Sequence, residues 1–124
     1  MKIVVAFALA LFTYIAHADG ILVGTVTRVW DGDTITLRTL EGETEKIRLV
    51  GIDAPEKGQP HWKDSWSWLK RTINNRTVTV KWIGRDRTGS QRLLGTIYVA
   101  GENFNLLMVC RGQAWYYRQY AASL

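Results

Sequence analysis

The stretch that decides the fold is Val29–Thr34, which reads V-W-D-G-D-T. It joins two runs of alternating apolar residues, Val23–Trp30 and Thr34–Leu40, and an Asp-Gly pair between such runs is a strong signal for a β-hairpin. Asp31-Gly32 accounts for the turn on its own, so the second aspartate, Asp33, needs another explanation. Two interpretations are open at this point: an ordinary hairpin turn, and half of a metal site.

The alternation also predicts which side chains share a face of each strand. On the first strand it places four residues on one face, Val23, Thr25, Thr27 and Val29. On the second strand, Ile35 and Leu37 share one face. A turn is expected at residues 41–43, followed by a third strand at Glu45–Val50. These three strands are predicted to form an antiparallel meander.

A helix and two further strands follow the meander. Apolar residues recur at helical spacing in Trp62, Trp66, Leu69 and Ile73. Alternation returns at Thr77–Ile83 and Leu93–Val99, and a turn and cap at residues 100–103 precede a short helix that begins at Phe104. The order βββ-α-ββ-α predicts an α+β fold, mainly β: a five-stranded OB-fold barrel with a helix between the third and fourth strands and a short C-terminal helix.

The first eighteen residues read as a secretory signal peptide. Lys2 precedes an apolar run, Ile3–Ile15, and Ala16-His17-Ala18 has the small-residue pattern of a cleavage site. The alternative is a membrane anchor, but the run is shorter than the roughly 18–20 residues that span a bilayer. We therefore expect one domain at residues 19–124, periplasmic or secreted. Loss of Lys2 lowers the formal charge from +5 to +4, which suits an anionic partner such as nucleic acid.

The chain has one cysteine, Cys110, which cannot form a disulfide within the chain. It follows the apolar stretch Leu106–Val109, so we expect a buried and unreactive thiol.

Six tryptophans are present, and burial is the usual use of such large rings. Trp62 and Trp66 lie on the apolar stripe of the predicted helix, so we expect them to pack in the core. Trp68 and Trp115 are placed less clearly and are candidates for surface contacts.

A second acidic cluster, Asp53-Ala54-Pro55-Glu56, follows the third strand. Proline makes the segment a stiff corner, and with Asp31 and Asp33 it brings four acids to the ends of adjacent strands. Ligands that offer only oxygen suit Ca²⁺ or Mg²⁺. The alternative is a solvated turn face with surface ion pairs of little energetic value.

Arg48 joins this cluster only if the backbone bends. In a straight strand Arg48 and Asp53 would be ~16 Å apart with side chains on opposite faces. Glycine in a strand often marks a bend, and Gly51 lies between them. We therefore expect a bend at Gly51.

Three stretches together resemble the staphylococcal nuclease (thermonuclease) family: D-G-D-T at 31–34, I-R-L-V-G-I-D-A-P-E at 47–56, and R-L-L-G-T-I-Y at 92–98. The resemblance runs from about Val23 to about Tyr120. It implies an OB-fold, calcium-dependent phosphodiesterase that cleaves DNA and RNA with little sequence specificity and leaves 3′-phosphate ends. We expect such an enzyme to be a monomer with nucleic acid as its partner.

The resemblance also implies roles for individual residues. Asp33, Asp53 and the main-chain oxygen of Ala54 would hold Ca²⁺, while Asp31 would lie nearby without binding it. Glu56 would position or deprotonate the attacking water. Two guanidiniums, those of Arg48 and Arg92, would hold the scissile phosphate, and the charge that develops on phosphoryl oxygens suits a cation and arginine forks.

The sequence also departs from the family pattern. Many relatives have threonine where this chain has Ala54, and Ser90-Gln91 lengthens the loop before Arg92. Thr88 stands where a tyrosine is usual, and a second substrate-contacting tyrosine falls on or beside Arg118. The chain ends at Leu124, before the position of the family's third helix, so we expect lower stability and weaker activity.

Two other functions are weighed against the nuclease. The first is a non-catalytic OB-fold module that binds nucleic acid, which the missing third helix favours. The second is a structural exported protein, which leaves the acids and arginines unexplained. Retention of all five key side chains favours the enzyme: Asp33, Arg48, Asp53, Glu56 and Arg92.

Overall fold

The structure is a computed structural model that describes residues 19–87 and 89–117. The predicted signal peptide at residues 1–18, Thr88, Arg118 and the expected site of the third helix lie outside these ranges, so the predictions about them stand as made. No helix within the described ranges has the length and apolar character needed to cross a membrane.

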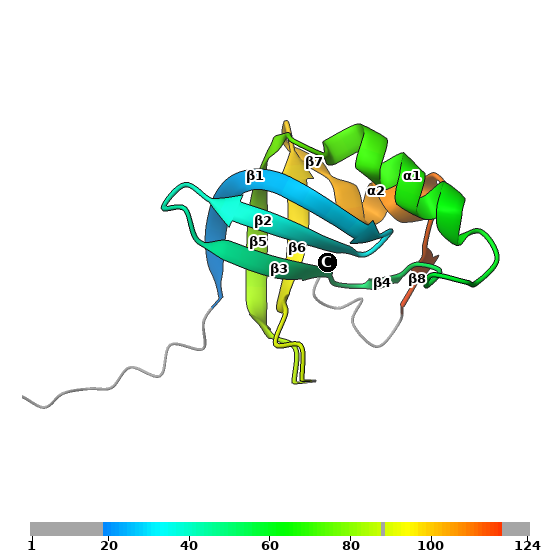
Figure 1. Cartoon of the computed structure of the whole chain (residues 1–124), viewed down its shortest axis with the longest axis horizontal. Coiled ribbons are helices and arrows are strands. Elements are labelled where there is room, and N and C mark those ends of the chain that lie inside the picture. Colours follow the sequence, from blue (N-terminus) through cyan, green and yellow to red (C-terminus); the bar gives the residue numbers. More distant parts are fainter. Residues whose placement is uncertain (1–18, 88, 118–124) are drawn as a thin grey trace, which may run out of the picture.

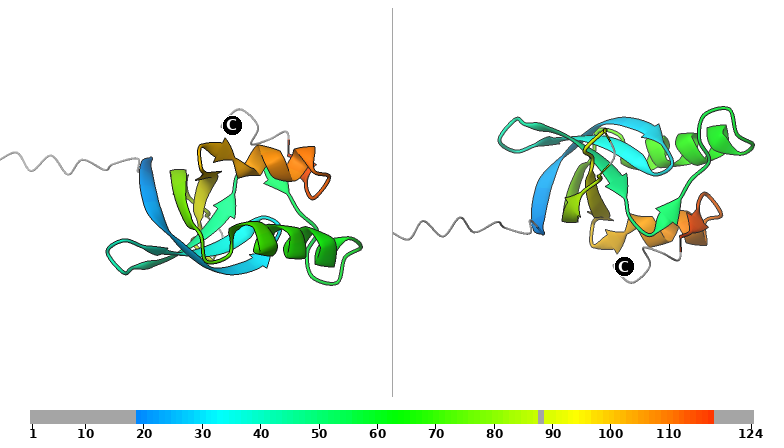
Figure 2. Two further views of the ribbon diagram at one scale, coloured as in Figure 1. Left: turned by 90° about the horizontal axis from the view of Figure 1, so that it is seen from above. Right: turned by 90° about the horizontal axis from the view of Figure 1, so that it is seen from below.

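Five strands form a closed barrel (Figures 1 and 2). An antiparallel meander of β1 (Gly20–Asp31), β2 (Thr34–Thr39) and β3 (Thr44–Leu49) comes first. The other two strands are β5 (Thr77–Arg85), which pairs with β1, and β6 (Leu93–Val99), which pairs with β5. A parallel contact between β6 and β3 completes the circle, which confirms the predicted five-stranded OB-fold barrel.

Figure 2 shows two helices at one end of the barrel. The core lies inside the barrel and against these helices. All five strands contribute side chains that are fully buried, among them Val26, Ile35, Ile47, Val80 and Ile97. The helices α1 (Trp62–Ile73) and α2 (Phe104–Cys110) add Leu69, Ile73, Phe104 and Met108. One apolar cluster therefore holds barrel and helices together.

Short strands complete the topology. The pair β4 (Ile52–Asp53) and β8 (Trp115–Tyr116) forms a separate antiparallel ribbon. The other short strand, β7 (Glu102–Asn103), pairs antiparallel with the end of β6. The Asn103 side chain then caps α2 by accepting from the Leu106 N–H at 3.1 Å. The predicted turn and cap before the second helix are thus confirmed.

The predicted face of β1 is wrong. Val26 and Val29 are buried whereas Thr27 is exposed. The cause is a β-bulge, because Val26 lies opposite Leu37 and Arg28 lies opposite Thr36, which leaves Thr27 as an extra residue. One extra residue exchanges the inner and outer faces of the strand beyond it.

The hairpin is confirmed, but its turn lies one residue later than predicted. Asp31 pairs with Thr34, so Gly32 and Asp33 form the turn, and neither has a positive φ. Glycine is needed at position 32 because the turn packs closely against its neighbours: a Cβ there would lie 2.8 Å from the Ala54 Cβ and would collide with Ser65 Oγ. The turn is thereby fixed against α1.

Burial of Cys110 is also predicted wrongly, since the thiol is exposed. Phe104 and Met108 define the buried face of α2. Cys110 lies two residues beyond Met108, a rotation of about 200° around the helix, and therefore faces away from the core.

The tryptophans divide differently from the expectation. Trp66 packs on the core as predicted, but so does Trp68, whose ring centroid lies 6.3 Å from that of Phe104. Trp62 stacks on Trp66 and has no place in the core cluster. Trp115 is largely exposed, as expected of a surface residue.

Asn105 is a buried polar residue that the sequence reading does not single out. Its Oδ1 accepts from the Ile97 N–H at 3.0 Å, and its Nδ2 donates to the carbonyls of Val50 (2.9 Å) and Gly95 (3.0 Å). Three buried hydrogen bonds from one side chain join α2 to β6 and to the chain just after β3. Loss of one such partner leaves groups unsatisfied.

We expect Gly32→Ala to lower the free energy of unfolding by about 1–3 kcal/mol, because the added methyl group overpacks the contact between turn and α1. Gly89→Ala is the matched control, since a Cβ at that position meets nothing within 4 Å, and its effect should stay within about 0.5 kcal/mol. Urea denaturation of both variants measures the difference. Equal stabilities would contradict the close packing at Gly32.

Candidate functional site

The hairpin turn presents a buried carboxylate. Asp33 is 6% exposed, and its Oδ2 accepts from the Ala54 N–H at 2.8 Å. Its Oδ1 accepts from the Thr34 hydroxyl at 3.1 Å, and its own N–H donates to Asp31 Oδ1 at 3.0 Å. Asp31 therefore shapes the turn, while Asp33 is held at the inner end of the site.

Burial raises the pKa of Asp33 from 3.8 to about 6, and a hydrogen bond with the Asp31 side chain adds to the rise. The positive charge of Arg48 opposes this shift. A carboxylate that is desolvated yet faces a cation is typical of a functional site.

The backbone bends sharply at Gly51, as predicted. Gly51 has a φ of 76° and lies between β3, which ends at Leu49, and β4, which starts at Ile52. Arg48 fills the inside of this bend: its Nη1 donates to the Leu49 carbonyl at 2.5 Å and to the Ile52 carbonyl at 3.0 Å. The bend turns Asp53 back towards Arg48.

Arg48 then bridges the two aspartates that the sequence singled out. Its Nη2 lies 3.3 Å from Asp33 Oδ2 and 3.6 Å from Asp53 Oδ1. Asp53 is half exposed, in contrast to buried Asp33. Two carboxylate oxygens, one from the β1–β2 turn and one from β4, thus converge on one cationic nitrogen, which brings residues 48 and 53 together as the bend requires.

The donor set fits a hard cation in part. Asp33 and Asp53 supply two carboxylates, and the described residues contain no group of three or more His, Cys, Asp or Glu side chains placed to hold a metal. A metal bound here would therefore need main-chain and water oxygens as well, which is common for Ca²⁺. Convergence of both carboxylates on the Arg48 guanidinium marks a position that favours positive charge.

Arg92 lies beside this centre and is held in place by two partners. Its Nε and Nη2 donate to Asp86 Oδ2 at 3.1 and 2.7 Å, and its Nη1 donates to Thr34 Oγ1 at 3.3 Å. The Thr34 hydroxyl in turn donates to Asp33. A continuous chain of hydrogen bonds therefore links Arg92 to the buried carboxylate.

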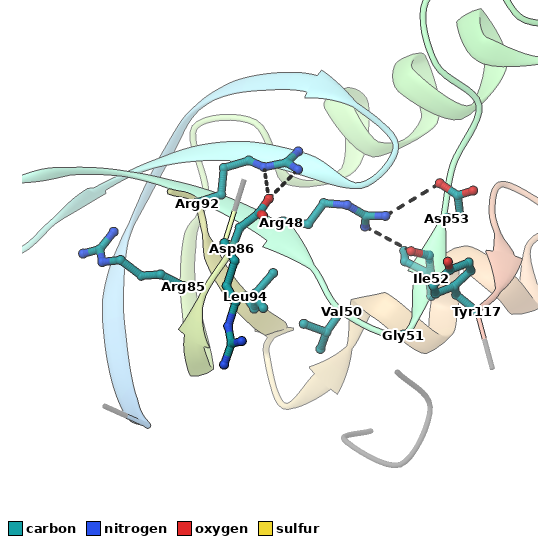
Figure 3. Close-up of a pocket in the computed structure, with 11 residues that line it drawn as sticks. Arg48, Val50, Gly51, Ile52, Asp53, Arg85, Asp86, Arg92, Leu94 and Tyr117 are labelled. Carbon is teal, nitrogen blue, oxygen red and sulfur yellow. Dashed lines mark hydrogen bonds and ion pairs between the residues drawn. The ribbon is translucent and has the colours of Figure 1, made fainter. Parts of the chain in front are cut away.

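Figure 3 shows the cavity that Arg48, Asp53, Asp86 and Arg92 help to line. Its volume is about 520 Å³. Four arginines contribute to it, Arg48, Arg85, Arg87 and Arg92, against two acids, Asp53 and Asp86. Tyr117 closes one side, and its N–H donates to the Gly51 carbonyl at 2.8 Å. An excess of guanidiniums around a hollow of this size suits a phosphate group.

Glu56 is the predicted site residue that the structure keeps apart. It is exposed and, like Asp33 and Ala54, does not line the cavity, but it makes no hydrogen bond or ion pair with Asp33, Arg48 or Asp53 either; its N–H donates to Gln59 Oε1 at 2.7 Å. Ala54, by contrast, lies at the centre, where its N–H holds Asp33.

Two positioning residues escape the sequence reading, Thr34 and Asp86. Asp86 is a single acid between two arginines in the sequence R-D-R at 85–87, a pattern that indicates a partner for a nearby guanidinium. Thr34 gives no signal of its own beyond its place in the D-G-D-T stretch.

The fold and the site together define an OB-fold protein with an arginine-lined anion cavity beside two converging aspartates. The family model described as "Staphylococcal nuclease homologue" matches residues 46–123. The chain belongs to the staphylococcal nuclease family.

Curated relatives carry nuclease names. The chain is 46% identical over 98 residues to an "Uncharacterized endonuclease" of Escherichia coli, an alignment that covers 78% of this chain and 62% of the relative. It is 37% identical over 106 residues to a "Micrococcal nuclease" of Shigella flexneri (78% and 59% covered). It is 30% identical over 95 residues to a "Thermonuclease" of Staphylococcus intermedius (72% and 56% covered). The chain thus spans about three fifths of the length of these relatives.

We expect Asp33→Asn to stabilise the metal-free protein at pH 8 and to lose this advantage in acid. The pKa of Asp33 is raised on folding, so protonation of Asp33 stabilises the folded state. This stabilisation is fully present below pH 3.8 and is lost as the pH rises through about 6. Asparagine avoids that loss, which amounts to at most about 3 kcal/mol.

Urea denaturation of both proteins at pH 4 and pH 8, with a chelator present, measures this difference. Asp53→Asn is the control, because its carboxylate is half exposed. A stability difference between wild type and Asp33→Asn that does not change with pH would contradict the assignment.

Proposed function

We propose that this protein is a secreted or periplasmic, calcium-dependent nuclease. It hydrolyses phosphodiester bonds of DNA and RNA with little sequence specificity and leaves 3′-phosphate ends. The observation that carries the proposal is the convergence of Asp33 and Asp53 on Arg48, next to a cavity that Arg48, Asp53 and Arg92 line. The nuclease names of the relatives support it.

Arg48 and Arg92 bind the scissile phosphate. Both arginines line the cavity, and guanidiniums are well matched to phosphate oxygens. Asp86 and Thr34 hold Arg92 in position, so little side-chain entropy is lost when the phosphate binds. These donors stabilise the negative charge that develops on the phosphoryl oxygens.

Asp33, Asp53 and the main-chain oxygen of Ala54 would hold Ca²⁺. When bound, the ion supplies charge stabilisation at the phosphoryl oxygens and lowers the pKa of coordinated water. The same two carboxylates pair with Arg48 in the described structure, so calcium and this ion pair use the same oxygens.

Glu56 positions or deprotonates the attacking water. Its carboxylate makes no hydrogen bond or ion pair with any residue in the described ranges, and solvent reaches it. A carboxylate in this role contributes a factor of about 10²–10⁴ to the rate.

Broad specificity follows from what the cavity contacts. Contacts to phosphate oxygens read no base sequence, and no contact to the 2′-hydroxyl is required, so both DNA and RNA are substrates. We further propose that residues 1–18 are removed on export and that the mature protein is a monomer.

A non-catalytic nucleic-acid-binding module is the second candidate. The placement of Glu56 outside the arginine-lined cavity favours it, because a base must reach the water that it activates. Cleavage assays separate the two functions.

The full chain is expected to cleave single-stranded DNA at millimolar Ca²⁺, and a chelator is expected to abolish cleavage. Glu56→Gln should lower the rate by about 10²–10⁴-fold while binding of the strand persists. Gel analysis of labelled strands measures the cleavage. Binding without calcium-dependent cleavage above the Glu56→Gln level would refute the enzyme and favour the binding module.

Asp33→Ala should harm calcium-dependent cleavage more than Asp31→Ala, because Asp33 faces the cation position while Asp31 shapes the turn. Thermal unfolding gives a second readout: calcium should raise the melting temperature of wild type and of Asp31→Ala but not of Asp33→Ala. Equal effects of the two substitutions on both measurements would refute this division of roles.

A further inference from the structure

A second groove, of about 700 Å³, lies between β1 and α1. None of its lining residues lines the arginine cavity. It combines three cationic side chains with three tryptophans: Arg28, Lys57 and Lys70, and Trp30, Trp62 and Trp66. Among the described residues that line it none is acidic.

The aromatic rings of the groove form flat layers with the cations. Trp62 and Trp66 are stacked with centroids 5.5 Å apart and planes 12° apart, and Lys70 Nζ lies 4.7 Å from the centroid of Trp66. The Arg28 guanidinium lies 3.4 Å from the ring centroid of Trp30. Lys46 also contacts the Trp30 ring, at 4.2 Å, but does not line the groove. Of the two cations on the Trp30 ring, Arg28 is therefore the one that lines the groove.

Hydrogen bonds hold two of the rings in fixed positions. Trp66 Nε1 donates to the Val29 carbonyl at 2.8 Å, and Trp30 Nε1 donates to Thr36 Oγ1 at 2.9 Å. Trp62 Nε1 is buried and has no hydrogen-bond partner within the described ranges. Rings that are already fixed lose little entropy when a ligand stacks on them.

The groove adjoins the candidate active site along the chain at two points. Trp30 directly precedes the D-G-D turn, and Lys57 directly follows Glu56. A polymer held at the arginine cavity that extends past these segments would reach the groove.

Charge and shape together select the ligand. Several cations with no acid among the lining residues favour a polyanion, and fixed aromatic planes favour exposed bases. An acidic peptide would satisfy the cations but not the rings, and bases in a duplex are already stacked on one another.

We propose that this groove binds a single-stranded stretch of nucleic acid next to the part held at the arginine cavity. Its phosphates pair with Arg28, Lys57 and Lys70, and its bases stack on the layers built by the tryptophans. That the bound strand is the enzyme's substrate rests on the function proposed above.

The test measures binding of labelled oligodeoxythymidylate of about twelve nucleotides to full-length Glu56→Gln protein with a chelator present, so that no cleavage occurs. Trp30→Ala and Lys70→Ala, each added to this protein, are expected to weaken binding by about 5- to 50-fold. Lys70→Ala should also reduce the slope of log affinity against log salt by about 0.7. The two substitutions should weaken binding of the twelve-nucleotide strand more than binding of a dinucleotide.

Two matched controls isolate the groove. Lys63→Ala removes the same charge from an exposed position of α1 outside the groove, and should bind as the parent does. Trp30→Phe keeps an aromatic plane and should recover most of the affinity lost in Trp30→Ala. Thermal unfolding of each variant identifies any that fails to fold.

Each remaining outcome is decisive. The groove proposal is overturned if Trp30→Ala and Lys70→Ala bind the strand as tightly as the Glu56→Gln parent does. It is also overturned if an abasic strand or polyglutamate binds as tightly as oligodeoxythymidylate. If wild type cleaves while the groove variants keep their affinity, only the groove proposal fails. If binding depends on the groove but wild type shows no calcium-dependent cleavage, only the enzyme proposal fails.

Discussion

The parallel contact between β3 and β6 is the constraint on which the rest of the structure depends. Only three residue pairs make it, and one of them sets Arg48 beside Leu94. This pairing closes the barrel and brings Arg48, from the first half of the chain, to Arg92, from the second. Gly95, which takes part in this pairing, has no room for a side chain, because a Cβ there would lie 2.7 Å from Val80 Cγ1 on β5. Asn105 then secures the same place, since its amide holds the carbonyls of Val50 and Gly95 together.

Around that closure, the polar side chains form one connected system. Asp86 holds Arg92, Arg92 contacts Thr34, Thr34 donates to Asp33, and Asp33 faces Arg48. Each member is oriented by the next, so the guanidiniums and carboxylates are arranged before any ligand arrives. Such preorganisation places charge where it is needed without reorganisation during a reaction. The raised pKa of Asp33 is the cost of holding a carboxylate in so dry a position.

Local patterns predict those parts of the fold that depend on neighbours in the chain. The hairpin, the first helix and the bend at Gly51 all follow from residues within a few positions of one another. Long-range packing decides what the sequence reading missed. The bulge at Thr27 is visible only in the register with β2, and Asp86 gains its meaning only when the barrel brings Arg92 beside it. Asp33, Arg48 and Asp53 are brought together as predicted, whereas Glu56 stands apart.

The exposed thiol at the end of α2 has a practical consequence. Cys110 is the only cysteine of the chain, so its oxidation to a disulfide can only join it to another molecule. Preparations kept without a reductant would accumulate covalent dimers. The apparent molecular mass would then rise with storage time, although the fold is unchanged. The same thiol is a unique attachment point for a spectroscopic label, available without any engineering of the chain.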